Sequence, residues 1–483
     1  MKKFKASRFF KSAVAFVLAL VMTFSVSFTS EAAINGIDVS KYQGSINWAA
    51  VAQSGVSFAF IKVGSTNKGL DPYFAANVKG AQAAGIRTGV YIYSYATTVQ
   101  AAATEASLVL KWIDGYNINY PIAFDMEDAC QKGLDPNTAT AICNTFCGVI
   151  AAAGYTPVVY TYSNYYKNHI TSALAYDKWI AQYSDHCDTA GWAIWQYSSS
   201  GAVAGISGRV DMDVAVKDYA SLIPQAGFVD AGNGGLYLYN NFRKQFGWVD
   251  MADHRYHTDE ATGLVTKGWF TDLTGTYYFG TDATATTGLA TIDKSVYYFD
   301  ENYHLYTGWA DLNGLRYLFN PADNGKMYMG FYTDTTGTYY LDTTDGHMVT
   351  GLTAIGKDFY YFNENGLMQV GLQTIGGNTY YFAADGKMQT GWQTIGAARY
   401  YFNTDGTLYK GLLQLKDGVY GLDEKDGHQL VNQMATIAGI NFLFGADGKL
   451  VVNQVVQIGD TIYATNAQGV VTATAPATAA ATK

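Results

Sequence analysis

The second half of the chain repeats itself about every 20 residues, and this repetition limits its fold more than any other feature. Two successive units read GLQTIGGNTYYFAADGKMQT at 371–390 and GWQTIGAARYYFNTDGTLYK at 391–410. Each unit holds a short strand, a turn, a Tyr-Tyr-Phe strand and an Asp-Gly turn, which is typical of one β-hairpin. Because a single hairpin is unstable in water, neighbours must stack, and residues 235–471 are predicted to form an all-β hairpin-repeat solenoid. The units begin at Gly247, Gly268, Gly288, Gly308, Gly330, Gly351, Gly371, Gly391 and Gly411, with weaker units near Gln433 and Gln454.

Residues 34–221 follow a different pattern, in which short apolar runs alternate with helical segments. Helices are predicted at Tyr73–Ala84, at Gln100–Trp112 and from Asp135 to Gly154, where an Asp-Pro pair starts the helix. Strands separated by helices favour a parallel sheet, and this segment is predicted to be an α/β irregular TIM-like (β/α) barrel. The strands are expected at Gly36–Val39, Phe58–Val63, Thr88–Tyr95, Pro121–Glu127, Pro157–Thr161, Lys178–Gln182, Ala193–Tyr197 and Val210–Val216.

The ends of the chain and the junction between its halves differ from both patterns. Residues 1–33 begin with cations, continue with an apolar run and end in small residues, which is the order of a secretory signal peptide. A membrane anchor is the alternative, although the apolar run is short for a span. Residues 222–234 are expected to be a linker, and the Ala/Thr-rich residues 472–483 a disordered tail.

Export makes the chain more acidic. Removal of the five cations and one acid in residues 1–33 changes the formal net charge from −9 to −13. Such a chain is a poor candidate for binding nucleic acid or an anionic membrane. We therefore expect a secreted protein that has no nucleic-acid partner and no membrane contact after the leader is cleaved.

Metal and cofactor motifs are absent from the sequence. It contains no Gly-x-Ser-x-Gly elbow, Walker loop or Cys-x-x-Cys pair, and His254 and His257 have no further ligands nearby. Cys143 and Cys147 share one face of a predicted helix, where buried small hydrophobic residues explain them, although disulfide pairing in an exported chain stays open. No metal site and no cofactor is predicted.

Acidic residues follow several of the predicted strands. Asp125 and Glu127 lie two apart in YPIAFDMED, so strand alternation puts both on one face, about 6.6 Å apart along the backbone. Asp38 ends the first strand, and Asp211 and Asp213 lie in the last one. The first and last strands of a closed barrel are neighbours, so these acids are expected to meet in one cleft. A carboxyl pair of this kind suits glycosidic bond cleavage, in which one group holds a proton.

Aromatic residues also lie near several strand ends. Core packing explains any one of them, but together they suit a groove in which sugar rings stack. The candidates for substrate binding are Tyr93, Tyr95, Tyr160, Tyr162, Trp195 and Tyr197, together with Lys62.

Residues 34–220 resemble the family 25 glycoside hydrolases, the bacterial and phage muramidases. The phrases that carry the resemblance follow that family's order and include GIDVSKYQGSINW at 36–48, FAFIKVG at 58–64, PIAFDMED at 121–128, WIAQY at 179–183 and AIWQYSSSGAVAGISGRVDMD at 193–213. The resemblance implies an irregular β/α barrel that hydrolyses the β-1,4 bond between N-acetylmuramic acid and N-acetylglucosamine in peptidoglycan.

The same resemblance implies a role for each acid. Glu127 would be the general acid that protonates the leaving oxygen. Asp125 would stabilise the oxocarbenium-like state or orient the 2-acetamido group of the substrate as the nucleophile. Asp38 and Asp211 would complete an acidic floor. Asp213 departs from the family pattern, which usually has asparagine there, so its charge would either shift the pH optimum or face away from the site.

The repeats are similar to the cell-wall-binding repeats of choline-binding and glucan-binding proteins, which implies a cell-wall location. A choline cage needs aromatic rings around a quaternary ammonium group. The first tryptophan of the choline type survives in several units, but the second is missing, and its position holds Thr276, Val296, Arg316, Thr379 or Arg399. We therefore expect a neutral glycan or another wall polymer as the repeat ligand, in preference to choline.

Three questions stay open at this point. An adhesion protein with an inactive barrel, or a glycosidase for another polysaccharide, would share most of these features. The acid spacing lies between the values for retaining and inverting glycosidases. The target, either the producer's own wall or that of a competitor, is not fixed by the sequence.

Overall fold

The computed structural model describes residues 33–477, so nearly all of the expected signal peptide lies outside the described residues. The chain divides into two compact units: residues up to 270 with 279–285, and residues 271–278 with 286 onward. Among the helices of residues 33–477, none is both long and apolar enough to cross a bilayer.

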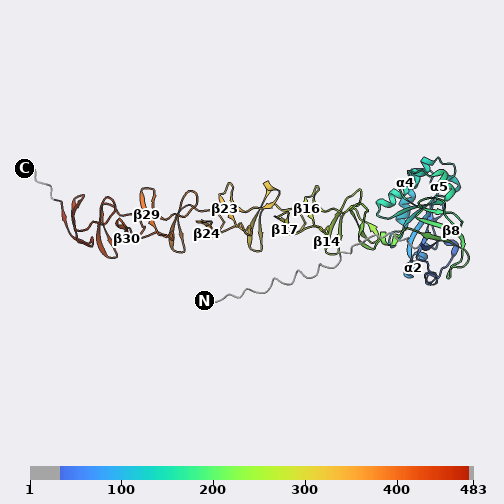
Figure 1. Ribbon diagram of the computed structural model, residues 1–483, viewed down its shortest axis with the longest axis horizontal. Helices are drawn as coiled ribbons and strands as arrows, with labels where there is room; N and C mark the ends of the chain where they lie inside the picture. Colours follow the sequence, from blue (N-terminus) through green and yellow to red (C-terminus); the bar gives the residue numbers. More distant parts are fainter. Residues whose placement is uncertain (1–32, 478–483) are drawn as a thin grey trace, which may run out of the picture. The chain divides into compact units, whose positions relative to one another are not determined.

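The N-terminal part of the first unit is a closed sheet of eight strands with helices around it (Figure 1). The sheet closes because the first strand pairs with both the second and the last, and a two-residue strand, β3 (Gly69–Leu70), extends its edge. All eight expected strands are present. The barrel strands are β1 (Ile34–Val39), β2 (Phe58–Ser65), β4 (Arg87–Tyr93), β5 (Ile122–Asp125), β6 (Pro157–Tyr162), β7 (Asp177–Ala181), β8 (Ile194–Gly201) and β9 (Val210–Ala215).

One strand corrects the expectation of a parallel sheet. β9 runs antiparallel to both of its neighbours, β1 and β8. Residues 202–209 join β8 to β9 without a helix, and a parallel return needs a longer crossover. The short connection therefore reverses the chain and makes the barrel irregular.

Helices cover the outside of the sheet, and the three that the sequence predicted are confirmed. The longest, α4 (Pro136–Ala152), begins where the Asp135 carboxylate accepts hydrogen bonds from the Asn137 and Thr138 N–H groups, both at 3.1 Å. Cys143 and Cys147 are buried on its inner face, and both are free thiols. The other helices are α1 (Trp48–Gln53), α2 (Phe74–Ala83), α3 (Val99–Trp112), α5 (Ser163–His169) and α6 (Tyr219–Leu222), with 3-10 turns at Lys41–Gln43, Ala129–Gln131 and Pro321–Asp323.

Aromatic side chains fill the interior of the barrel. The ring of Trp179 stacks on Phe60 with 4.3 Å between centroids and meets Tyr160 edge-on at 4.6 Å. Phe58 stacks on Tyr120 at 4.7 Å. These buried side chains form one packed cluster inside the barrel, so polar residues at the strand ends lie above an apolar core.

The first strands after the barrel belong to the same unit. β10 (Ala226–Asp230), β11 (Leu236–Asn240) and β12 (Arg243–Lys244) form a small sheet. Val229 and Tyr239 pack against the barrel interior cluster, and the Lys244 N–H donates to the Gly154 carbonyl at 2.8 Å. Residues 226–230, expected within a linker, are instead a strand that pairs with β11 and packs Val229 on the barrel cluster.

Hairpins make up most of the described residues from 247 onward, as the repeats predicted (Figure 1). In the unit that starts at 371, Gly376 and Gly377 have φ values of 56° and 86°, which the tight turn between its strands requires. The strands are β13 (Gly247–Met251), β14 (His254–Thr258), β15 (Gly268–Thr271), β16 (Thr276–Phe279), β17 (Gly288–Ile292), β18 (Ser295–Phe299), β19 (Gly308–Leu312), β20 (Leu315–Asn320), β21 (Lys326–Met327), β22 (Gly330–Thr333), β23 (Thr338–Leu341), β24 (Gly351–Ile355), β25 (Asp358–Phe362), β26 (Gly371–Ile375), β27 (Asn378–Phe382), β28 (Gly391–Ile395), β29 (Ala398–Phe402), β30 (Gly411–Leu415), β31 (Gly418–Leu422), β32 (Gln433–Ile437) and β33 (Ile440–Phe444).

Backbone hydrogen bonds join each hairpin to the one before it. Met388 bridges to Phe382 in its own repeat, and its N–H donates to the Phe359 carbonyl in the preceding repeat at 2.8 Å. Leu408 makes the same bond to Thr379, also at 2.8 Å. The segment after each Asp-Gly turn thus ties two hairpins together, which meets the need of an isolated hairpin for a neighbour.

The described part of the chain ends in a three-stranded sheet of β34 (Val455–Ile458), β35 (Thr461–Thr465) and β36 (Val471–Pro476). The expectation of a disordered tail from residue 472 does not hold for 472–476. β36 pairs with β35 because that strand otherwise presents an open edge. Residues 478–483 lie outside the described part of the chain.

Candidate active site

Four acidic residues from three regions of the sequence line one cavity of about 370 Å³. Asp38 lies near the end of β1, Asp125 ends β5, and Glu127 follows two residues later. Asp211 lies on β9 directly opposite Asp38 in the ladder. The structure therefore brings together all four acids that the sequence proposed as catalytic.

The floor of this cavity is aromatic. Tyr91, Tyr160 and Trp179 line it beneath the acids. Asp38 is 5% exposed and Asp125 is 4% exposed, so little water reaches either carboxyl group. Burial raises the pKa of both well above the usual range, and the negative charge of Asp213 adds to the effect on Asp38.

Glu127 combines a raised pKa with an accessible position. Burial is the main cause of the raised pKa, which the Tyr162 hydroxyl and the positive charge of Lys62 oppose by stabilising the charged form. The residue is half-buried and lines the cavity. A carboxyl group of this kind can carry a proton nearer to neutral pH and deliver it to a bound molecule.

Asp125 presents an unsatisfied oxygen. Its Oδ1 is buried and has no hydrogen-bond partner in the described chain. After burial, the charge of Glu127 contributes to its raised pKa, whereas Lys62 lowers it. Leaving a buried carboxylate oxygen unpaired is costly, so a donor on a ligand that enters the cavity would relieve the cost.

Gln196 was not proposed from the sequence, yet it organises the acidic end of the cavity. Its amide donates to Asp38 Oδ2 at 2.6 Å. Its carbonyl oxygen accepts hydrogen bonds from the Tyr160 and Tyr183 hydroxyls, both at 3.0 Å. Gln196 lies between two aromatic residues on a strand whose side chains alternate between two faces. That pattern could have predicted that Gln196 and the aromatic residues face opposite ways.

The structure does not bring Trp195 and Tyr197 to the cavity. Side chains alternate along β8, and Gln196 between them is the one that faces the barrel interior. The Trp195 indole N–H donates to the Gln182 carbonyl at 2.8 Å, and its ring packs on Tyr197. Neither residue therefore lines the acidic cavity.

Asp213 also lies outside the cavity lining. It is fully buried in the barrel, where its Oδ1 accepts a 2.8 Å hydrogen bond from the Trp179 indole N–H. Burial raises its pKa, and the proximity of its charge raises the pKa of Asp38. Asp213 faces away from the ligand space but still acts on the electrostatics of the site.

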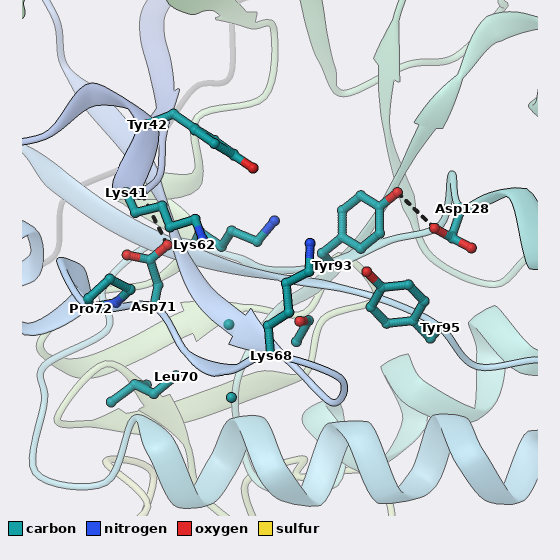
Figure 2. Close-up of a pocket in the computed structure, with 13 residues that line it drawn as sticks. Lys41, Tyr42, Lys62, Lys68, Leu70, Asp71, Pro72, Tyr93, Tyr95 and Asp128 are labelled. Atoms are coloured by element: carbon teal, nitrogen blue, oxygen red, sulfur yellow. Dashed lines mark hydrogen bonds between the residues drawn. The ribbon is translucent and has the colours of Figure 1, made fainter.

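The remaining proposed residues border the cavity or a second hollow beside it, which Figure 2 shows. Lys62 and Tyr93 line both hollows, with the Lys62 ammonium 4.5 Å from the centroid of the Tyr93 ring. Tyr95 lines only the second hollow, and Tyr162 lines the first. Tyr42, which sequence reasoning missed, lines both and is 78% exposed, as a ring that stacks on a sugar would be.

The described residues contain one group with the spacing of metal ligands, and it lies in the repeats. Asp423, Asp426 and His428 have ligand atoms within 4.8 Å of one another. Hydrogen bonds inside the group already engage them, because Asp423 accepts from the Asp426 N–H and Asp426 pairs with the His428 ring.

Comparisons with known proteins agree with this geometry. Residues 37–206 match the profile of glycosyl hydrolases family 25. Residues 369–393 and 389–433 match a choline-binding repeat, and residues 350–368 match a cell-wall-binding repeat.

Individual relatives cover the same part of the chain. The YegX protein of Escherichia coli O157:H7 is 30% identical over 203 residues, which are 40% of this chain and 74% of the relative. The autolytic lysozyme of Clostridium acetobutylicum is 31% identical over 205 residues, 42% of this chain and 61% of the relative. The solved lysozyme of Streptomyces coelicolor is 30% identical, with a TM-score of 0.33, and covers 38% of this chain and 91% of that one.

Proposed function

The chain belongs to glycosyl hydrolases family 25, and from this premise we propose that it is an exported muramidase. Its substrate is peptidoglycan, in which it hydrolyses the β-1,4 bond between N-acetylmuramic acid and N-acetylglucosamine. The observation that carries the proposal is the meeting of Asp38, Asp125, Glu127 and Asp211 in one cavity with an aromatic floor. That arrangement supplies a proton donor, a negative charge and an apolar face for a sugar ring.

In the proposed mechanism Glu127 donates its proton to the glycosidic oxygen as the bond to the anomeric carbon breaks. Asp125 accepts a hydrogen bond from the 2-acetamido N–H of the sugar, which satisfies its unpaired Oδ1 and turns the acetamido oxygen toward the anomeric carbon. Glu127, now ionised, takes a proton from the water that completes hydrolysis. Gln196 holds Asp38 in place through its 2.6 Å hydrogen bond.

We assign residues 34–221, with the small sheet of β10–β12 that packs on them, to the catalytic domain, and the hairpins from residue 247 onward to a stacked solenoid that holds the enzyme on the wall. Residues 1–33 direct export. Several weak repeat sites on one chain would give useful avidity even where each site alone binds poorly.

Arginine side chains in the repeats argue against choline as the wall ligand. The Arg399 guanidinium lies 4.4 Å from the Trp392 ring centroid, and Arg316 lies 5.1 Å from that of Trp309. These arginines stand where the second tryptophan of a choline-type unit would be. A cation of the chain itself thus covers the ring face that a quaternary ammonium group would need.

Identification of the sugar at new chain ends tests the catalytic proposal. Peptidoglycan digested with the full chain and then reduced with borohydride is expected to release muramitol as the new reduced end. Glucosaminitol in its place would show that the other glycosidic bond is cut. An absence of new ends would contradict the glycosidase role and favour an adhesion protein.

Competition with free choline tests the repeat ligand. The full chain, bound to purified walls, is expected to stay bound in choline at concentrations that release a choline-dependent wall protein included as the control. Binding is expected to persist on walls that contain no choline. Release by choline would contradict the proposal that the repeats bind a neutral glycan or another wall polymer.

A further inference from the structure

A second hollow of about 380 Å³ lies next to the acidic cavity and differs from it in charge. The two share Tyr42, Lys62 and Tyr93, so they are adjoining sections of one trough. The second section is also lined by Lys41 and Lys68. In Figure 2 the Lys68 side chain points toward Lys62 and Tyr93.

Lysines outnumber acids in the lining of this section. None of their ammonium groups forms an ion pair with a carboxylate in the part of the chain that the structure describes. The two acids of this section accept hydrogen bonds from neutral donors: Asp71 accepts from the backbone N–H groups of Lys41 and Tyr73 at 3.0 and 2.9 Å. Asp128 accepts from the Tyr93 hydroxyl at 3.1 Å and from a backbone N–H at 3.0 Å. With three lysines against two acids, this section carries a net positive charge in a chain whose formal net charge is −9.

We propose that this lysine section binds a carboxylate carried by the peptidoglycan strand beside the bond that is cut. The inference rests on the proposed function and adds a substrate feature to it. An ammonium group attracts a carboxylate by charge-assisted hydrogen bonding, and three of them around one hollow suit a mobile anionic side group. The sugar rings would lie on the exposed Tyr42 and on the aromatic floor.

Opposite charges in adjoining sections also fix the direction of the strand. The acidic section repels a carboxylate, whereas the lysine section attracts it, so only one orientation puts the anionic side group over Lys41 and Lys68. Lys62 stands at the junction and acts on both sections, because its charge also lowers the pKa of Asp125 and Glu127. Lys41 and Lys68 are exposed and do not line the acidic cavity, so they test the binding role alone.

The test compares Lys41→Gln, Lys68→Gln and the double variant with Lys79→Gln, an exposed lysine of α2 that lines neither hollow. Each is assayed on glycan strands with intact stem peptides and on strands stripped by an amidase, which leaves the lactyl carboxylate of muramic acid. The double variant is expected to raise KM about five- to twenty-fold with kcat within about twofold, and added salt should shrink the difference. A rise confined to intact strands identifies the stem peptide as the source of the carboxylate, and a rise confined to stripped strands identifies the lactyl group.

Equal KM values for the double variant and Lys79→Gln on both substrates would overturn the inference. A second measurement distinguishes failure of this inference from failure of the proposed function. Calorimetric binding of a soluble disaccharide–peptide fragment to the full chain should weaken by the same factor in the double variant, whether or not the fragment is cleaved. If the wild-type chain cuts neither substrate and the double variant still binds the fragment more weakly, the muramidase proposal alone is refuted.

Discussion

Replacing Glu127 with glutamine is expected to lower kcat on peptidoglycan by about 10²–10⁴-fold while KM and wall binding change little. Glutamine keeps the size of the side chain and its place in the cavity but has no proton to give to the leaving oxygen. Turnover of a soluble glycan strand measures the effect, and sedimentation with purified walls measures binding. Glu260→Gln, an exposed change in the hairpin region, is the matched control and should leave both unchanged.

The pH profile gives a second check on the same residue. Activity requires the protonated form of Glu127, so kcat falls as pH rises through the pKa of this group. Burial raises that pKa above the ordinary value, and the wild-type enzyme should therefore stay active at a higher pH than an exposed glutamate would allow. The residual activity of the Glu127→Gln variant should not show this fall of kcat with rising pH. If the Glu127→Gln variant still lyses walls, Glu127 is not the general acid.

The strand pattern made much of this site predictable. Asp125 and Glu127 were found because alternation along a strand places residues two apart on the same face. Asp38 and Asp211 followed from the closure of the barrel, which puts the first and last strands side by side, and the ladder pairs these two residues directly. The predictions that succeeded depended on backbone periodicity and topology.

Features that depend on which way a side chain turns were harder to predict. Trp195 and Tyr197 lie on either side of Gln196 in one strand, and Gln196 is the residue that lines the cavity. The prediction chose the two aromatic residues by their chemical character, although alternation along the strand puts them on the other face. Tyr42 lies in a short 3-10 turn outside any strand, so no periodicity marks its exposure. The antiparallel direction of β9 depends on the absence of a helix between 201 and 210 and not on the residues of the strand.

Replacing Asp125 with asparagine is expected to lower kcat by about 10²–10³-fold, because the variant loses the negative charge that faces the developing oxocarbenium ion. The amide oxygen of the new side chain can still accept the acetamido N–H, so KM should change less than kcat. Turnover of the same glycan strands measures both constants. Asp114→Asn, an exposed change after α3, is the control. A variant with the turnover of the control would show that Asp125 carries no charge in the transition state.

The same variant should be more stable than the wild type at neutral pH. The pKa of Asp125 is raised in the folded chain by burial and then by Glu127, so ionising it opposes folding. The stabilising contribution of the protonated carboxyl group is fully present below the unfolded pKa, near pH 4, and is lost as pH rises through the folded pKa. Denaturant unfolding of the Asp125→Asn variant should therefore show a gain of about 1–3 kcal/mol at pH 7 that vanishes near pH 3. A loss of stability at pH 7 would show instead that the attraction between the charged carboxylate and Lys62 stabilises the folded site.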